Sequence, residues 1–424
     1  MLSGDNGILQ KATDAKIQTG IGQEKEALSL AWNSCMVNKV AKYEDITDVQ
    51  LENELKSNGY NDVSVSKSGN KFKVTFNSGN IYTIKNDGTV QKYEKVEPTS
   101  IYAKLYTADG ILILSSTENY IDTTLGEYTD YGDVSHKVDY YTESRMGPEK
   151  LYGDYPGWID ENIYMPANSK IKRIIIHDKL APIKTAYWFA GCNQITSIEG
   201  IENLDTSNVT DMTCMFSCCT NLQSIDLNNF DTENVTNMYR MFKWCSKLTS
   251  LNLSSFNTKN VTTADEMFSN MQSLTSLDLS SFDTSKLTSA HRMFYNCYDL
   301  RNLNLNGWST SNITDMAEMF YCCYTLNSIN LNNFNTENVV NMAGMFYGCE
   351  SIDILDLSHF NTMKVENSSN MFGGWQDGVG GVTLEGHGHV LPVKASIIIG
   401  SNWNPSMTET ATNYYNGTFE VKNN

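Results

Sequence analysis

The sequence has no continuous apolar run of about 18 residues, the length that a membrane-spanning helix requires, so no segment is expected to cross a bilayer. No charged and apolar leader precedes the first residues, which predicts either a cytoplasmic chain or one that lacks its targeting segment. Basic residues are scarce, since 31 Lys and Arg stand against 49 Asp and Glu, for a formal net charge of -18. Without a basic footprint, neither nucleic-acid binding nor direct contact with an anionic membrane is expected.

Catalytic and metal-binding motifs are missing as well. The chain contains no P-loop, no GxGxxG, no HExxH and no nucleophile beside a base. It has only six histidines, and its one metal-like cluster, His387 and His389 between glycines, is a weak ligand set. We therefore predict no enzymatic activity, no cofactor and no metal site, with an enzyme kept as a remote alternative.

What the sequence does contain is a repeat with a period of 26 residues. The phenylalanine of a Met-Phe pair recurs in register at Phe216, Phe242, Phe268, Phe294, Phe320, Phe346 and Phe372, after an atypical copy at Phe189. Cysteine follows it by three residues at Cys192, Cys219, Cys245, Cys297, Cys323 and Cys349. Six cysteines at one repeat position indicate buried packing more than a disulfide framework. Whether Cys214, Cys218 and Cys322, which lie off this row, form disulfides stays open.

Each unit combines two apolar periods. Ile225-Asp226-Leu227 alternates apolar and polar residues, which predicts a short strand with one buried face. From Val235 to Leu248 the apolar residues are spaced by three or four, which predicts a short helix, partly of the 3₁₀ type. One unit cannot bury its apolar face alone, but stacked units can. The predicted fold is therefore α+β, a leucine-rich-repeat-like β/α solenoid.

The residues of the repeat resemble those of a known family. Asn203 to Met212, the following Met215-Phe216, and the Leu-Asn-Leu and Phe-Asn-Thr segments are similar to the BspA-like leucine-rich repeat surface proteins. Tyr187 to Cys192, with Ile198-Glu199-Gly200, resembles the way that family opens its array. The resemblance implies a bacterial cell-surface protein associated with adhesion to host or neighbouring-cell ligands. It supplies no catalytic residues.

The N-terminal segment, residues 1–95, has a different character. A long polar helix is predicted from about Ile8 to Cys35, a second helix capped by Thr47, and then an antiparallel sheet with strands near 63–65, 72–76 and 81–84. This order resembles a type IV pilin or pseudopilin headgroup. The apolar half of the pilin helix is absent, so pilus-type assembly would need a missing N-terminal helix. A small αβ cap of another kind is the alternative.

Segments on both sides of the array are predicted to cap it. Residues 99–180 read as a β-rich cap, with a hairpin at Asp109-Gly110 and a last strand at Ile174 to Ile176. Residues 181–375 form the array, and residues 376–424, with strand-like Ser396 to Ile399, form the C-terminal cap.

These observations predict a cell-surface adhesion or recognition protein that binds an extracellular protein or glycan. A structural pilin-like subunit, or a spacer that displays the array, is the alternative. The candidate ligand-binding residues are aromatic and local to a few coils: Tyr295, Tyr298, Tyr321, Tyr324, Tyr347 and Trp244. Tyrosine rows offer flat apolar area with a polar tip, but the same rings could simply cover the ends of short helices.

Overall fold

The computed structural model describes residues 5–37, 46–68, 71–85, 88–93, 99–118, 120–133, 170–373, 396–407 and 418–421. The chain divides into two compact units, Met1–Lys95 and Val96–Asn424. Within the described ranges, helices are few and strands form several small sheets, so the fold is mixed α and β. None of the helices in these ranges is long and apolar enough to span a membrane.

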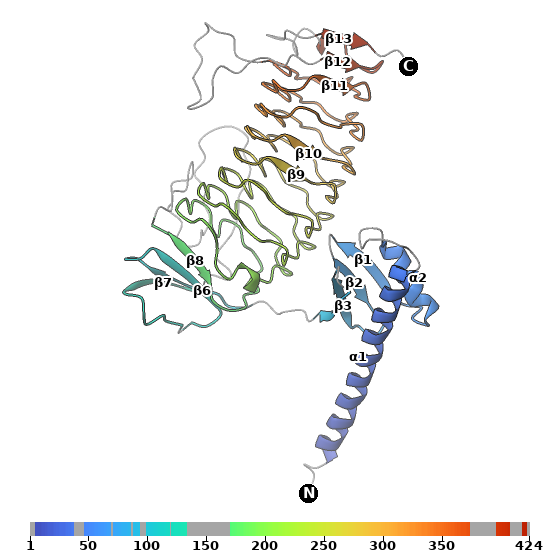
Figure 1. Cartoon of the computed structure of the whole chain (residues 1–424), viewed down its shortest axis with the longest axis vertical. Helices are drawn as coiled ribbons and strands as arrows, with labels where there is room; N and C mark the ends of the chain where they lie inside the picture. The colour runs from blue at the N-terminus through green and yellow to red at the C-terminus, as the bar shows by residue number, and fades with distance from the viewer. Residues whose placement is uncertain are drawn as a thin grey trace. The chain divides into compact units, whose positions relative to one another are not determined.

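The first unit joins two helices to one antiparallel sheet (Figure 1). Its elements are α1 (Asp5–Val37), α2 (Asp48–Ser57), β1 (Ser64–Ser68), β2 (Lys71–Thr75), β3 (Ile81–Lys85) and β4 (Val90–Tyr93). The strands lie in the order β1-β2-β3-β4. The predicted cap of α2 is confirmed: the Thr47 hydroxyl accepts a hydrogen bond from the Gln50 N–H, and the Gln50 side chain accepts one from the Thr47 N–H.

A buried carboxylate fixes α1 to this sheet. Glu24 is 7% exposed and accepts hydrogen bonds from the Ser78 hydroxyl at 2.6 Å, the Asn80 amide at 2.8 Å and the Tyr82 hydroxyl at 2.7 Å. Trp32, about two helical turns further on, packs edge-on against Phe72 at 5.8 Å between ring centroids. A buried acid with three donors is satisfied, so this contact positions the helix on the sheet.

The second unit opens with a small sheet in the order β7-β5-β6-β8. Its strands are β5 (Tyr102–Tyr106), β6 (Ile111–Ser115), β7 (Tyr128–Asp133) and β8 (Arg173–Ile176). The predicted hairpin is confirmed, with Gly110 at φ 69° in its turn. β8 pairs in parallel with β6, and Ile175 then bridges to Glu199 in parallel. The hairpin sheet therefore continues into the repeats, just before the 3₁₀ turn η2 (Ile201–Asn203).

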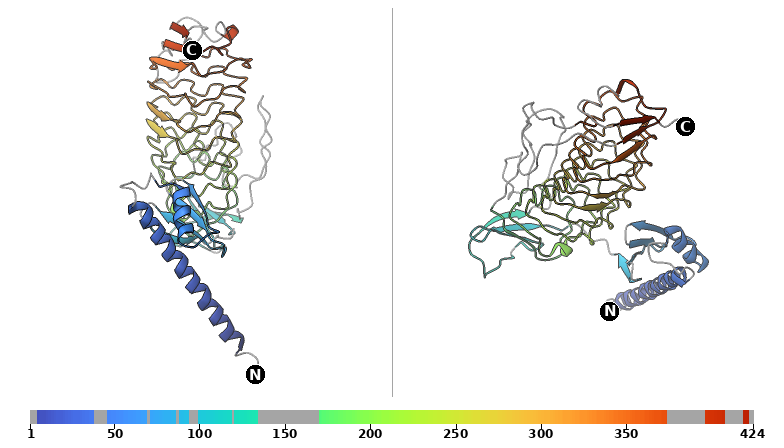
Figure 2. Two further views of the ribbon diagram at one scale, coloured as in Figure 1. Left: turned by 90° about the vertical axis from the view of Figure 1, so that its right-hand side faces the viewer. Right: turned by 45° about the horizontal axis from the view of Figure 1, so that its top comes forward.

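The repeats stack coil upon coil, as Figures 1 and 2 show. The rings of the Met-Phe row lie face to face from Phe189 to Phe372, with centroids 5.5 to 6.1 Å apart. A second row contains Phe230, Phe256 and Phe282, and later Trp308, Phe334 and Phe360, with spacings of 6.3 to 6.5 Å. These distances are those of favourable stacking, so each coil buries the apolar face of its neighbour.

The cysteine row is buried within this core, as its position predicted. The six side chains are 0% exposed, and the Cys297 thiol donates to the carbonyl oxygen of Phe268 in the preceding coil at 3.1 Å. Burial raises the pKa of Cys297 to about 12. Among the described residues, the nine cysteines of the array form no disulfide, including Cys214, Cys218 and Cys322.

The predicted helix in each repeat is wrong. The Met-Phe segment is a chain of turns. Its backbone N–H groups alternate between donating within their own coil and donating to the next coil. The Met215 and Ser217 N–H groups donate back three residues within the coil, whereas Cys214 and Phe216 donate to the next coil. Left-handed residues before and after the phenylalanine, such as Cys214 at φ 53° and Cys218 at φ 61°, prevent a helix. The spacing of apolar residues by three or four positions therefore reflects successive turns whose side chains face the core.

Regular strands are also fewer and shorter than the alternation of apolar and polar residues in each unit predicts. Within the described repeats, regular strands occur at β9 (Ser276–Asp278), β10 (Asn302–Asn304) and β11 (Ile354–Leu357). β11 pairs in parallel with β12 (Ser396–Ile399), which pairs in parallel with β13 (Thr418–Val421). The stack therefore extends beyond residue 375.

Polar rows fasten the coils to one another. A buried threonine recurs at Thr206, Thr232, Thr258, Thr284, Thr310, Thr336 and Thr362. Thr284, for example, donates its hydroxyl to the Ser309 carbonyl oxygen and accepts from the Ser309 N–H, both at 2.9 Å. The Asp278 carboxylate accepts the N–H of Ser280, two residues on, as its counterparts in other coils do. The repeated Asx and Thr residues are thus needed by the turns.

Candidate functional site

The candidate tyrosines form two stacked rows in three consecutive coils. Tyr295 and Tyr321 have ring centroids 4.8 Å apart, and Tyr321 and Tyr347 are 4.5 Å apart. In the second row, Tyr298 and Tyr324 are 4.9 Å apart. Because each row occupies one repeat position, the coil-to-coil register alone brings the rings together. We call these five residues the tyrosine stripe.

Much of the tyrosine stripe is covered. Tyr298 is 4% exposed and Tyr347 is 8% exposed, while Tyr295, Tyr321 and Tyr324 are half-buried. All of them except Tyr295 form, with buried Cys322, a small cluster separate from the main core. Burial raises the pKa of Tyr295 and of Tyr298 to about 12. A ligand could therefore touch the three half-buried rings, and the other two support them.

Trp244 does not belong to the stripe. It stands two coils earlier, at the repeat position of Asn270 and Asn296, and its backbone is left-handed with φ 63°. Its side chain is half-buried. The structure thus brings five of the six predicted residues into two rows and places the sixth at a different repeat position.

A row of alternating charges runs beside the tyrosine stripe. Arg240, Glu266, Arg292 and Glu318 occupy the position two residues before the phenylalanine in four consecutive coils, each with φ between 53° and 56°. The Arg292 guanidinium donates to the Glu318 carboxylate at 2.9 Å and lies 5.3 Å from the centre of the Tyr295 ring. Arg292 therefore links the charge row to the stripe through an ion pair and a cation–π contact.

The strongest ion pairs of this row lie deeper. Glu266 is 4% exposed and accepts two hydrogen bonds from Arg240, at 2.9 and 2.5 Å, and another from Lys243. Burial raises the pKa of Glu266, but Lys243 and Arg240 outweigh that effect and lower its pKa to about 2. Burial likewise lowers the pKa of Lys243. The cluster carries one net positive charge in a strongly acidic chain.

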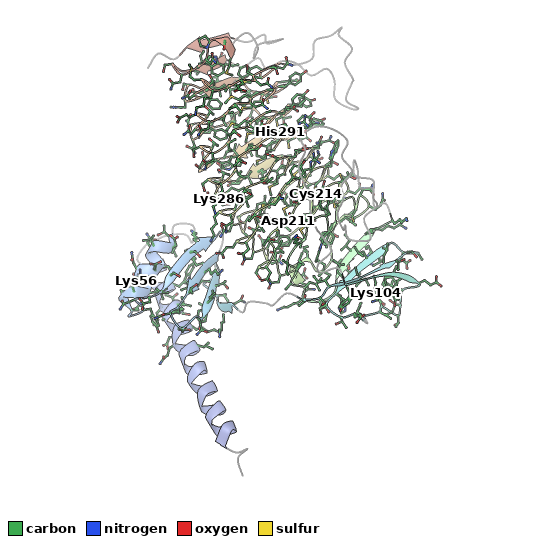
Figure 3. The ribbon with its side chains drawn as sticks, turned by 180° about the vertical axis from the view of Figure 1, so that it is seen from behind. Lys56, Lys104, Asp211, Cys214, Lys286 and His291 are labelled. Atoms are coloured by element: carbon green, nitrogen blue, oxygen red, sulfur yellow. The ribbon has the colours of Figure 1, made fainter. Side chains whose placement is uncertain are left out.

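Asp211 and Cys214, two potentially reactive side chains of the array, have structural surroundings. Asp211 and Cys214 lie in one coil and His291 in a later one (Figure 3). The Asp211 carboxylate accepts from the Thr213 N–H and hydroxyl, and burial raises the pKa of Cys214 to about 12. Among the described residues, no group of three or more His, Cys, Asp or Glu side chains could hold a metal ion. The predicted weak cluster at His387 and His389 lies outside the described residues.

These features define the array as a repeat protein whose coils stack on their neighbours through shared rows of side chains. Residues 184–303 and 293–377 match a family model described as Mycoplasma protein of unknown function, DUF285. The match supports the BspA-like resemblance for the array, whereas the N-terminal unit lies outside it. Neither the curated proteins nor the solved structures yield a match to this chain.

The sequence reasoning missed two features of the array. The alternating Arg and Glu at one repeat position is visible in the sequence, because Arg240, Glu266, Arg292 and Glu318 share the period of 26. A polar groove on the sheet face of the coils around β9 and β10 was also missed. It depends on small differences in how well successive coils cover their core, for which the repeat pattern gives no signal.

Proposed function

We propose that this chain is a non-enzymatic recognition protein of a bacterial cell surface. Its array is a leucine-rich-repeat-like solenoid that binds an extracellular protein or glycan ligand. One observation carries the proposal: the residues shared by all coils are used inside the stack, whereas Tyr295, Tyr321 and Arg292 are peculiar to a few coils and remain partly accessible. Tyrosine and arginine are among the residue types most enriched where proteins bind partners.

The N-terminal unit fits a role in display. A long helix followed by an antiparallel sheet is the order expected of a pilin-like headgroup, so we propose that this unit anchors the array in a pilus-type or similar assembly. The alternative is a structural subunit in which the array is only a spacer. The two differ in whether the chain retains any ligand.

Binding by the full chain tests the proposal. The protein is immobilised and exposed to a panel of extracellular-matrix proteins, glycans and intact cells, beside a Tyr295→Ser/Tyr321→Ser variant. Each substituted ring is half-buried, so the variant should keep the circular dichroism of the parent and lose at least about tenfold in affinity, the equivalent of about 1.4 kcal/mol. Tyr239→Ser, at a half-buried tyrosine outside the stripe, is the matched control. Retention of no panel member by the parent would favour the spacer.

The solenoid itself is tested by deletion. Removing residues 268–293 takes out one full repeat and lets the neighbouring coils meet in the same register, so a folded protein is expected. Removing residues 268–280 joins different repeat positions and should abolish the cooperative unfolding of the array. Equal tolerance of both deletions would contradict a nearest-neighbour stack.

A further inference from the structure

A groove of about 490 Å³ crosses three coils on the sheet face of the array. We call it the sheet-face groove. Its lining comprises Ser276, Leu277, Asp278, Asn302, Leu303, Asn304, Leu305, Asn306, Ser328, Ile329 and Asn330. The volume lies in the range of small-molecule sites, about 300–1,000 Å³. Because three neighbouring coils span two strand-like spacings, roughly 10 Å, the groove suits a compact ring-shaped ligand or a short chain of rings.

The groove is open where the core is least covered. At the first inward position of the strand segment, Leu251, Leu277 and Leu355 are buried, whereas Ile225 in an earlier coil is half-buried. Leu303 and Ile329, at the same repeat position in the groove, are half-buried. The turn after β10 contains Gly307, at φ 91°, which has no side chain. The groove therefore has an apolar floor that a ligand can reach.

Its rim contains amides and hydroxyls but no cation. The side-chain oxygens of Asn304 and Asn330 each accept a hydrogen bond from the backbone N–H two residues later. The Asn330 side-chain amide donates to the Asn306 side-chain oxygen at 3.2 Å. Within the described part of the chain, no hydrogen bond engages the side chains of Ser276 and Asn302, which are both exposed. Asp278 contributes the one carboxylate of the lining. The rim thus offers both donors and acceptors to a ligand.

We infer that the sheet-face groove is a binding site for an uncharged saccharide. A sugar ring presents hydroxyls around its edge and C–H groups on its face, which complement the polar rim and the floor of Leu303 and Ile329. Anionic sugars, phosphates and nucleic acids lack a cation to pair with and meet Asp278 in a chain of net charge -18. The groove lies on the strands, whereas the tyrosine stripe lies on the chain of turns, so the two sites are separate.

This inference deepens the proposed recognition function and rests on it. It is tested on the full chain with uncharged hexasaccharides of glucose, mannose and N-acetylglucosamine, followed by saturation-transfer NMR and titration. Ser276→Trp should fill the groove and abolish binding, and Asn302→Ala should weaken it about tenfold, the equivalent of about 1.4 kcal/mol. Ser224→Trp, at the same repeat position two coils earlier and outside the groove, is the matched control and should bind like the parent.

Three outcomes would overturn the inference. The first is that no hexasaccharide binds at about 10 mM, tenfold above a Kd of ~1 mM. The second is that Ser224→Trp and Ser276→Trp lose saccharide affinity equally. The third is that a sulfated or sialylated saccharide binds more tightly than a neutral one. If no saccharide binds but the chain still retains another ligand through the tyrosine stripe, the inference fails while the proposed function stands.

Discussion

The buried carboxylate of Glu266 allows a sharp test of the energetics of the array. Glu266→Gln removes the charge that pairs with Arg240 and Lys243 while leaving a side chain of nearly the same size. The pKa of Glu266 falls from its ordinary value of 4.5 to about 2, which at ~1.4 kcal/mol per tenfold corresponds to ~3 kcal/mol of folding free energy at pH 7. Removing one partner of a buried ion pair, which leaves the other charge unpaired, has a similar cost of about 3–5 kcal/mol.

The pH dependence follows from the direction of the pKa shift. A depressed carboxyl pKa stabilises the folded state fully above the unfolded value of about 4.5, and this stabilisation is lost as the pH falls through about 2. At pH 3 only about 1 kcal/mol of this stabilisation should remain, so the cost of Glu266→Gln should fall by roughly 2 kcal/mol between pH 7 and pH 3. Urea unfolding followed by circular dichroism at both pH values measures the difference.

The control is Glu318→Gln, which breaks the pair with Arg292. The side chains of this pair are 40% and 25% exposed, so its loss should cost less than about 1 kcal/mol. Adding Lys243→Met to Glu266→Gln should recover part of the lost stability, because one unpaired buried cation is removed. The reasoning is refuted if Glu266→Gln costs no more than Glu318→Gln, or if its cost is the same at pH 3 and pH 7.

Three further predictions concern the framework. Thr284→Val should destabilise the array by about 1–3 kcal/mol in urea, because the Ser309 N–H loses its acceptor, and Thr284→Ser should not. Cys297 should react with a small alkylating reagent only on unfolding, and Cys297→Ser should cost about 1–3 kcal/mol; rapid labelling of the native protein would contradict its burial. Gly200→Ala should cost about 1–3 kcal/mol, because φ is 73° and the new methyl would lie 2.1 Å from the Ile176 carbonyl oxygen; an unchanged melting temperature would show that the turn relaxes.

The sequence predicted the parts of this fold that depend on position in the repeat. Phe216 and its counterparts stack, and Cys297 is buried, because a residue at a fixed repeat position meets the same residue in the next coil. The cap at Thr47 and the turn at Gly110 were equally readable, since both are local. The tyrosine rows follow from the same register, but the burial of Tyr298 does not, because it depends on the side chains of two neighbouring coils.

The helix prediction failed because the deciding hydrogen bonds are not local. Periodicity of three or four residues reports which side chains face the core, and a chain of turns can satisfy it as well as a helix can. In this array the N–H of Phe216 donates to Met241 in the next coil, and a helix would have used it within the coil. The sheet-face groove was unpredictable for a related reason, since it depends on how far Leu303 is covered by its neighbours.

The left-handed positions show where such an array can vary. The residue two positions before the phenylalanine has a left-handed backbone in every coil, with φ between 53° and 62°. These residues are Tyr187, Cys214, Arg240, Glu266, Arg292, Glu318, Gly344 and Asn370. A side chain in this region is disfavoured by roughly 1–2 kcal/mol, so the residue itself does not choose the conformation. The stack imposes it, because each N–H at this position from Tyr187 to Gly344 donates to the next coil. Backbone geometry is thus independent of side-chain identity here, so a substitution at this position changes the charge and ion pairs of a coil but not its backbone conformation. Under the proposed recognition function, we expect substitutions in the row beside the tyrosine stripe to alter ligand preference while the backbone of the coil is kept.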